Sequence, residues 1–204
     1  ELSLARMFCG GVSICLRDQK RSEPKLVELY ARRPTPGELL DLLPWDGEYG
    51  RYNLVVCHML RRKIIMIKNK LKHERAPGVV FVPRDPKVPE STDLYLAEGT
   101  ELIACDNEIS MNIYNAGFYS VVSVSDKSVF LRDDDYPGEP IEMPLKKVQS
   151  LLRGREAFTY QCAQGRSLRG KIVLHGLKSK YLTPTHQWVG LSRGCELHQY
   201  AVAP

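Results

Sequence analysis

The sequence predicts an α/β fold that is interrupted by a small antiparallel β module. Asn53–His58 is a short apolar run that leads almost directly into a helical pattern over Met59–Glu74. A strand followed at once by a helix opens a parallel β-α-β unit. Residues 98–149 instead show short alternating apolar runs separated by turn residues, which is typical of antiparallel strands. The α/β character returns after this stretch.

Capping patterns predict the elements ahead of the first β-α-β unit. Val12–Leu16 is apolar and partly β-branched, which indicates a short strand. Ser22 can cap a helix that has Pro24 in its first turn. Thr35 and Glu38 form a capping box, and we expect a second short helix to begin there.

The stretch Met59–Glu74 predicts a helix because its apolar residues recur at helical spacing. These residues are Ile64, Ile67 and Leu71. The positions between them are basic: Arg61, Arg62, Lys63, Lys68, Lys70 and Lys72. A charge-rich helix face is usually only solvated, although this one also suits a polyanion. Residues 75–97 carry several prolines and mixed charges, which favours a connection.

Four short strands are expected in the insertion. They are Glu101–Cys105, Tyr119–Val124, Ser128–Arg132 and Ile141–Met143. Pro144–Leu152 favours a short helix. The domain prediction is therefore an α/β domain at residues 1–97 and 150–204, with a small antiparallel barrel or sheet at residues 98–149.

Strand and helix patterns alternate again near the C-terminus. Ala157–Gln161 and Lys171–Leu174 predict two strands. Thr183 is placed to cap a helix that runs to Leu191, and Leu197–Val202 favours a final strand.

Composition excludes several classes of protein. The 204 residues are 43% hydrophobic and 26% charged, which is ordinary for a globular domain, and the net charge of +5 is compatible with a polyanionic partner. The six cysteines form no Cys-x-x-Cys pair, so we expect reduced thiols, no metal site and an intracellular, reducing compartment, cytoplasm or nucleus. No run of about 18 apolar residues is present, so no membrane span is expected. The chain opens at Glu1 rather than Met, and we expect an excised segment.

One string imitates a phosphate-binding loop. Gly165–Lys171 fits Gly-x-x-x-x-Gly-Lys, but Ile172 stands where a Ser or Thr would ligate Mg²⁺. The lysine of a true loop opens a helix, whereas Ile172–Leu174 prefers a strand. We interpret the match as a coincidence. A complete small nucleotide-binding enzyme that uses this loop is the alternative.

Two strings near the C-terminus carry a resemblance to a known family. Ala157–Gly165 reads Ala-Phe-Thr-Tyr-Gln-Cys-Ala-Gln-Gly, and Trp188–Gly194 reads Trp-Val-Gly-Leu-Ser-Arg-Gly. They resemble the last two motifs of superfamily 1 helicases of the RecD-like branch, Thr-x-His-x-x-Gln-Gly and Tyr-Val-Ala-Leu-Ser/Thr-Arg. Weaker matches follow the family order from about Ile14 to Val202.

The resemblance implies the second RecA-like motor domain, a parallel sheet flanked by helices, with an inserted small β-barrel. It also implies that an N-terminal motor domain precedes this segment and binds most of the ATP and Mg²⁺. In the family, the arginine that corresponds to Arg193 is a finger for the γ-phosphate. Arg21 matches a second phosphate-sensing arginine, and Gln164 with Gly165 would couple the nucleotide to the strand. Without the family, Arg193 would cap helix carbonyls and Arg21 would be a solvated flank.

The resemblance also assigns contacts to single-stranded nucleic acid. Its candidates are Thr159, Gln161, Cys57, His58, Arg61 and Asn107. Gln161 departs from the histidine that is usual at its position, and a glutamine amide can still donate a hydrogen bond to the strand. Asn107 is interpreted first as a turn residue and second as a strand contact.

Besides the small nucleotide-binding enzyme, two functions remain open from the sequence. The first is the C-terminal motor half of an ATP-dependent 5′–3′ DNA helicase, inactive as an ATPase without its partner domain. The second is a non-catalytic nucleic-acid-binding or interaction module derived from such a domain. Backbone contacts do not separate single-stranded DNA from RNA.

Overall fold

A parallel sheet forms one half of the molecule. The computed structural model describes residues 22–204, and the strand order of this sheet is β11-β10-β1-β9. The strands are β1 (Tyr52–Val55), β9 (Ala157–Thr159), β10 (Ile172–Leu174) and β11 (Tyr200–Val202). All three neighbouring pairs are parallel. Every strand residue is buried, as expected of a parallel sheet that is covered on both faces.

Helices cover both faces of this sheet. They are α2 (Pro24–Ala31), α3 (Pro36–Leu42), α4 (His58–His73) and α6 (Pro184–Leu191). One apolar cluster joins α2, α3 and α6 to the sheet residues Leu54, Phe158 and Leu174. A second cluster joins α4 to Val55 and Ala157, which point the opposite way because side chains alternate along a strand.

The insertion is a curled antiparallel sheet of order β7-β6-β5-β4-β8. Its strands are β4 (Glu101–Ala104), β5 (Phe118–Val124), β6 (Ser128–Asp133), β7 (Ile141–Pro144) and β8 (Leu152–Gly154). Helix α5 (Leu145–Leu151) lies between the last two strands. Strand β8 follows residue 149 in the sequence yet pairs antiparallel with β4. The sheet therefore takes in residues from beyond the expected end of the insertion.

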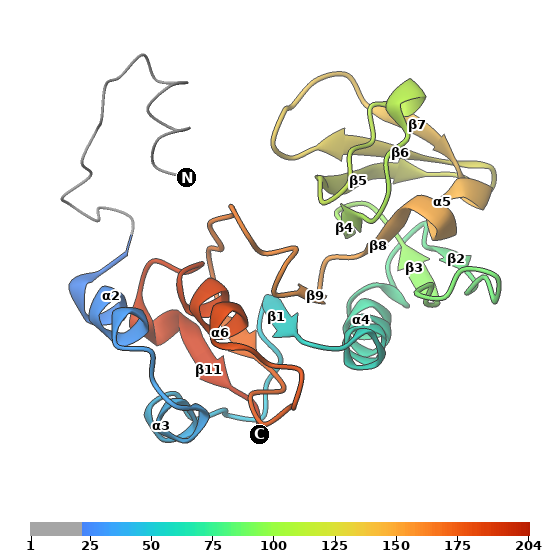
Figure 1. The fold of residues 1–204 in the computed structure, drawn as a ribbon. Coiled ribbons are helices and arrows are strands. Elements are labelled where there is room, and N and C mark those ends of the chain that lie inside the picture. The colour runs from blue at the N-terminus through green and yellow to red at the C-terminus, as the bar shows by residue number, and fades with distance from the viewer. Residues whose placement is uncertain (1–21) are drawn as a thin grey trace, which may run out of the picture.

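Residues 75–97 contain a strand pair that the sequence pattern did not predict. Strands β2 (Val80–Val82) and β3 (Leu94–Leu96) form a two-stranded antiparallel sheet. The side chain of Asn69 on α4 accepts from the backbone N–H of Tyr95 and donates to its carbonyl. Three-residue strands carry too little periodicity to detect, and this contact with α4 holds them. In Figure 1, α4 lies beside β1, and the strand pair lies on the other side of α4, below the insertion.

The predicted RecA-like α/β fold with an inserted antiparallel sheet is confirmed. Thr35 forms the capping box that was predicted. The prediction for Ser22 is wrong: Glu23 precedes the helix, and the Ser22 hydroxyl donates instead to the carbonyl of Gly194 at 3.0 Å. The predicted strand Val12–Leu16 lies outside the described residues.

The last predicted strand is shorter than expected. Leu197–Gln199 forms a 3-10 turn (η2), and only Tyr200–Val202 joins the sheet as β11. Across residues 22–204, no helix combines the length and the apolar character that crossing a membrane requires.

Candidate nucleic-acid interface

Three loops adjoin at the carboxyl edge of the parallel sheet. In the register of β1 and β9, Val55 lies opposite Thr159, so both strands end at the same level. The loop after β10 approaches the loop after β1, since a Cβ on Gly176 would lie 2.8 Å from Cγ2 of Val56. Ligands of open α/β sheets bind at such edges, which makes this the candidate interface.

The loop after β9 divides into a buried anchor and an exposed tip. Thr159 is buried, and its hydroxyl donates to Sγ of Cys162 at 3.3 Å and accepts from the Cys162 backbone N–H. Gln161 is exposed, and its amide nitrogen lies 2.7 Å from Nε2 of His186 on α6. The structure therefore presents Gln161 to solvent, while Thr159 stabilises the turn.

The loop after β1 leads into α4. Cys57 is the N-cap residue of this helix and its side chain makes no capping hydrogen bond. His58 is exposed, with Nδ1 at 2.8 Å from a carboxylate oxygen of Glu90. Arg61 is only 4% exposed and forms an ion pair with the other oxygen of Glu90. Arg61 thus faces the protein, and Cys57 and His58 form the accessible end of the helix.

Asn107 lies in the insertion, in the loop after β4. Its Oδ1 accepts from the backbone N–H of Asn115 at 2.9 Å, so its side chain has the turn role that was expected first. The loop that it closes is contacted from the parallel half. Arg166 donates to the carbonyl of Ala116 and stacks on the ring of Phe118, with 3.6 Å between the guanidinium carbon and the ring centroid.

Gln164 and Gly165 complete the turn after β9. Both are exposed, and the backbone N–H of Gln164 donates to the carbonyl of Gln161 at 3.0 Å. Gly165 has a φ of +81°, a left-handed conformation that glycine adopts without steric cost. The chain can therefore reverse here and run back beside α6.

Arg193 follows the last turn of α6 and is turned inward. It is 6% exposed; Nε donates to the carbonyl of Val189 at 3.0 Å, Nη1 to that of Arg166 at 3.3 Å, and Nη2 to Oγ of Ser192 at 2.7 Å. The Arg193 carbonyl in turn accepts from the backbone N–H of Leu168. The structure thus brings Arg193 to the turn that contains Gln164 and Gly165. Its bond to Val189 is the helix-capping arrangement expected without the family.

Arg21 lies outside the described residues. The described chain begins beside Arg193, because Ser22 donates to Gly194 and the backbone N–H of Glu23 donates to the carbonyl of Cys195 at 2.7 Å.

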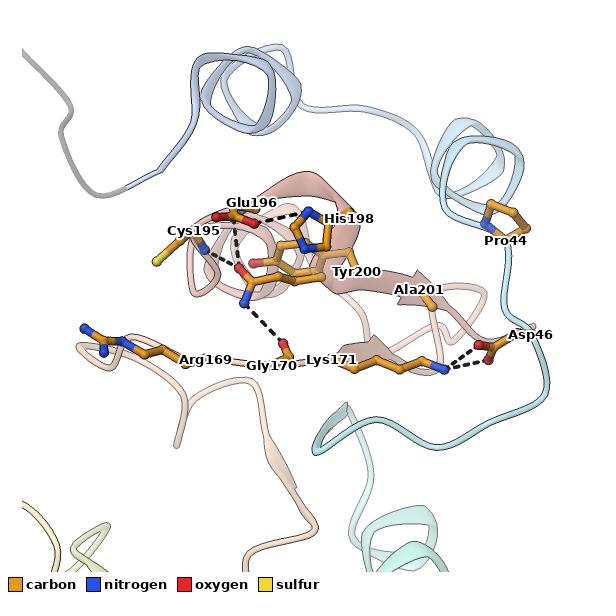
Figure 2. Close-up of a pocket in the computed structure, with 11 residues that line it drawn as sticks. Pro44, Asp46, Arg169, Gly170, Lys171, Cys195, Glu196, His198, Tyr200 and Ala201 are labelled. Carbon is orange, nitrogen blue, oxygen red and sulfur yellow. Dashed lines mark hydrogen bonds and ion pairs between the residues drawn. The ribbon is translucent and has the colours of Figure 1, made fainter.

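The loop Gly165–Lys171 does not form a phosphate cradle. Lys171 leads into strand β10 rather than a helix, and its Nζ lies 2.6 Å from both carboxylate oxygens of Asp46. This hydrogen bond lowers the pKa of Asp46. Figure 2 shows the pair in a pocket of about 830 Å³. Among residues 22–204, no group of three His, Cys, Asp or Glu side chains is placed to hold a metal ion. The strand that follows Lys171 agrees with the interpretation of the sequence match as a coincidence.

Two features of the interface were missed from the sequence. His186 occupies the third position of α6, where its ring accepts from the backbone N–H of Thr183 and completes a capping box. That position usually holds Glu or Gln, and the His was the available signal. Lys178 and Lys180 are exposed in the loop after β10 and add positive charge to the edge.

No protein-family model and no curated protein matches the chain. Solved structures do. A Pif1 helicase, from a structure of two coordinating Pif1 helicases that unwind forked double-stranded DNA, has 20% identity and a TM-score of 0.64 over 91% of this chain and 48% of its own. Bacteroides Pif1 in complex with ADP-AlF3 and single-stranded DNA has 20% identity and a TM-score of 0.64. The match covers 94% of this chain and 52% of the Bacteroides chain.

Candida albicans Pif1 helicase is similar at 13% identity and a TM-score of 0.54, over 88% of this chain and 53% of its own. The chain therefore spans about half the length of the solved helicases that it matches. At these identities the likeness concerns the fold alone. The chain has the fold that about half of a Pif1 helicase has.

Proposed function

We propose that the chain is the C-terminal motor half of an ATP-dependent 5′–3′ DNA helicase or translocase of superfamily 1. Its two late motifs favour the RecD-like branch. Residues 1–97 and 150–204 would form the motor domain, with β8 contributed to the sheet of the 98–149 insertion. The order of the motifs and the shared fold support this proposal.

One observation carries the proposal. The segment 159–168 runs beside α6 and touches both of its ends. Gln161 contacts His186 in the first turn, and the carbonyl of Arg166 accepts from Arg193 after the last turn. The strand-facing edge and the arginine that would face the nucleotide are therefore linked by one helix and one short segment.

The strand contact would be made at the carboxyl edge of the sheet. A solved structure that shares the fold, Bacteroides Pif1, contains single-stranded DNA. In this chain Gln161, Cys57 and His58 are accessible there, and the exposed lysines after β10 supply charge without reading sequence. Buried groups act in support: Thr159 holds its turn, and Arg61 neutralises Glu90.

The nucleotide would be shared with another domain. ATP with Mg²⁺ would be held mainly by an N-terminal motor domain, and this chain would supply Arg193 and Arg21. The guanidinium of Arg193 must then leave three neutral acceptors for a phosphate. Hydrogen bonds to a charged acceptor are about twice as strong as neutral ones, which favours the exchange once a nucleotide is present.

A second candidate is a nucleic-acid-binding module without a catalytic role. The burial of Arg193 favours it, because Nε, Nη1 and Nη2 of the guanidinium all donate within the domain. In that case Arg193 would stabilise the end of α6 and nothing more.

The two candidates separate in a protein that joins this chain to a nucleotide-binding motor domain. If Arg193 is a finger, Arg193→Ala lowers DNA-stimulated ATP turnover by roughly 10³-fold or more, with strand affinity nearly unchanged. Arg169→Ala is the matched control, since Arg169 is exposed and lies in the pocket of Figure 2. Unchanged ATP turnover in Arg193→Ala, together with a lower melting temperature, would exclude the finger role and favour the non-catalytic nucleic-acid-binding module.

A further inference from the structure

We propose that His186 is a positioning residue for Gln161, and that its imidazole decides which end of the Gln161 amide faces the nucleic-acid strand. The inference rests on the proposed strand contact and adds a residue from α6 to it. The turn after β9 and the first turn of α6 would then act as one binding unit.

The contact is held on both sides. Nε2 of His186 lies 2.7 Å from the amide nitrogen of Gln161, and Nδ1 lies 3.1 Å from the backbone nitrogen of Thr183. The ring also packs on Tyr160, with 5.9 Å between centroids. Tyr160 is itself fully buried, and its hydroxyl donates to the carbonyl of His175. The imidazole therefore has little freedom to turn.

The capping bond fixes the tautomer. The backbone N–H of Thr183 can only donate, so Nδ1 presents its lone pair to it. The Thr183 hydroxyl lies 3.2 Å from the same nitrogen; it accepts from the backbone N–H of His186, and its own proton can be donated to Nδ1. In the neutral ring the proton then lies on Nε2, which donates toward Gln161. The only acceptor in that amide is its oxygen, and a half-turn of the group brings the oxygen to Nε2. The amide NH₂ then points away from His186.

This orientation suits a phosphate. An outward NH₂ offers two donors to phosphate oxygens, whereas an outward carbonyl oxygen would repel them. A free glutamine side chain samples many rotamers, and ordering it on binding costs free energy. Because His186 orders the amide beforehand, the strand meets a prepared donor pair at the exposed tip of the turn.

Four single variants of the 204-residue chain test the proposal, with anisotropy of a labelled oligothymidylate of about 16 nucleotides as the measurement. Gln161→Ala and His186→Ala should each weaken binding roughly 10-fold, since each removes an oriented bond to a charged acceptor. The double variant should also lose only roughly 10-fold, because both changes remove the same bond.

The two remaining variants separate orientation from helix capping. Glu and Gln both suit the capping box, so His186→Gln and His186→Glu should keep the melting temperature. Gln can donate to the Gln161 amide and should bind like the wild type. Glu can only accept, turns the NH₂ inward and should weaken binding at least 10-fold.

Two results would overturn the proposal while leaving the strand contact intact: a roughly 100-fold loss in the double variant, or wild-type affinity in His186→Glu. A wild-type chain that does not bind the oligothymidylate would instead remove the proposed strand contact itself, and the positioning role with it.

Discussion

The parallel sheet and the insertion differ in whether the polar side chains near them are paired inside the protein or exposed to solvent. Beside the insertion sheet, the buried Arg155 forms ion pairs with both Glu101 and Asp134. At the carboxyl edge of the parallel sheet, Gln161 and Gln164 remain exposed. An ion pair offsets the cost of removing the Arg155 charge from water, so we interpret this pairing as a structural feature. Ordered polar side chains that face solvent therefore indicate an interface better than the number of charged residues in a region does.

The same two regions nevertheless share one apolar core. Ile64 and Ile65 of α4 belong to the cluster that contains Leu102 and Tyr119 of the insertion. A Cβ on Gly154 of β8 would lie 2.7 Å from Cγ2 of Ile65, which shows how closely the two regions approach. The insertion is therefore a separate sheet but not a separate core.

The largest expected effect tests this shared core. Ile65→Ala should lower the free energy of unfolding by about 2–5 kcal/mol, because Ile65 is fully buried at the junction. Urea unfolding followed by far-UV circular dichroism and by tyrosine fluorescence should give one coincident transition. Ile109→Ala is the control, since Ile109 is 75% exposed. Two separate transitions would show that the sheets fold as independent units.

A buried carboxyl at the same junction gives the second prediction. Burial raises the pKa of Glu156 from 4.5 to about 7, although the charges of Lys72 and Lys68 oppose the shift. The native state then binds the proton more tightly than the unfolded state. The stability that Glu156 contributes is full below pH 4.5 and is lost as the pH rises through 7. The loss amounts to roughly 3 kcal/mol.

Glu156→Gln should remove this loss. The free energy of unfolding of the variant, relative to the wild type, should rise by roughly 3 kcal/mol between pH 4.5 and 7. His175 acts in the opposite direction, because burial lowers its pKa to about 4 and stability from that group grows as the pH rises to 6.5. The comparison between variant and wild type cancels the His175 contribution. Glu98→Gln, at an exposed site, is the control. If the unfolding free energy of Glu156→Gln ran parallel to that of the wild type across this pH range, the raised pKa of Glu156 would be contradicted.

The smallest effect concerns the packing of α6 on the parallel sheet. A Cβ on Gly190 would lie 2.7 Å from Cε1 of the buried Tyr160, so Gly190→Ala should cost about 1–3 kcal/mol. Gly37→Ala is the matched control, because its Cβ would meet only Oγ1 of Thr35 at 4.0 Å. That change should be neutral or stabilising by up to about 1 kcal/mol. Equal urea midpoints for the two variants would mean that α6 is packed less tightly than the structure indicates.

Much of the fold was accessible from the sequence, and less of the site. The strand-helix order around α4, the capping box at Thr35, the cap at Thr183 and the alternating runs of the insertion all follow from residues that lie close together in the sequence. The three-residue strands β2, β3 and β8 did not, because pairing with distant partners defines them. The motifs predicted Gln161 and Arg193 as site residues. They gave no indication that His186 contacts Gln161 or that Arg193 is turned inward.

The sequence by itself determined the α/β layer and its antiparallel insertion, because hydrophobic periodicity and capping act within a few residues. Only the tertiary structure decided which polar groups stay available. Glu90, far from the motifs in the sequence, forms an ion pair with Arg61. The backbone N–H of Thr183 donates to the His186 ring, which contacts Gln161. A charged group or a hydrogen-bond donor pairs with whichever group lies near it in the folded protein. The separation of two residues along the chain does not show whether they are near each other in space.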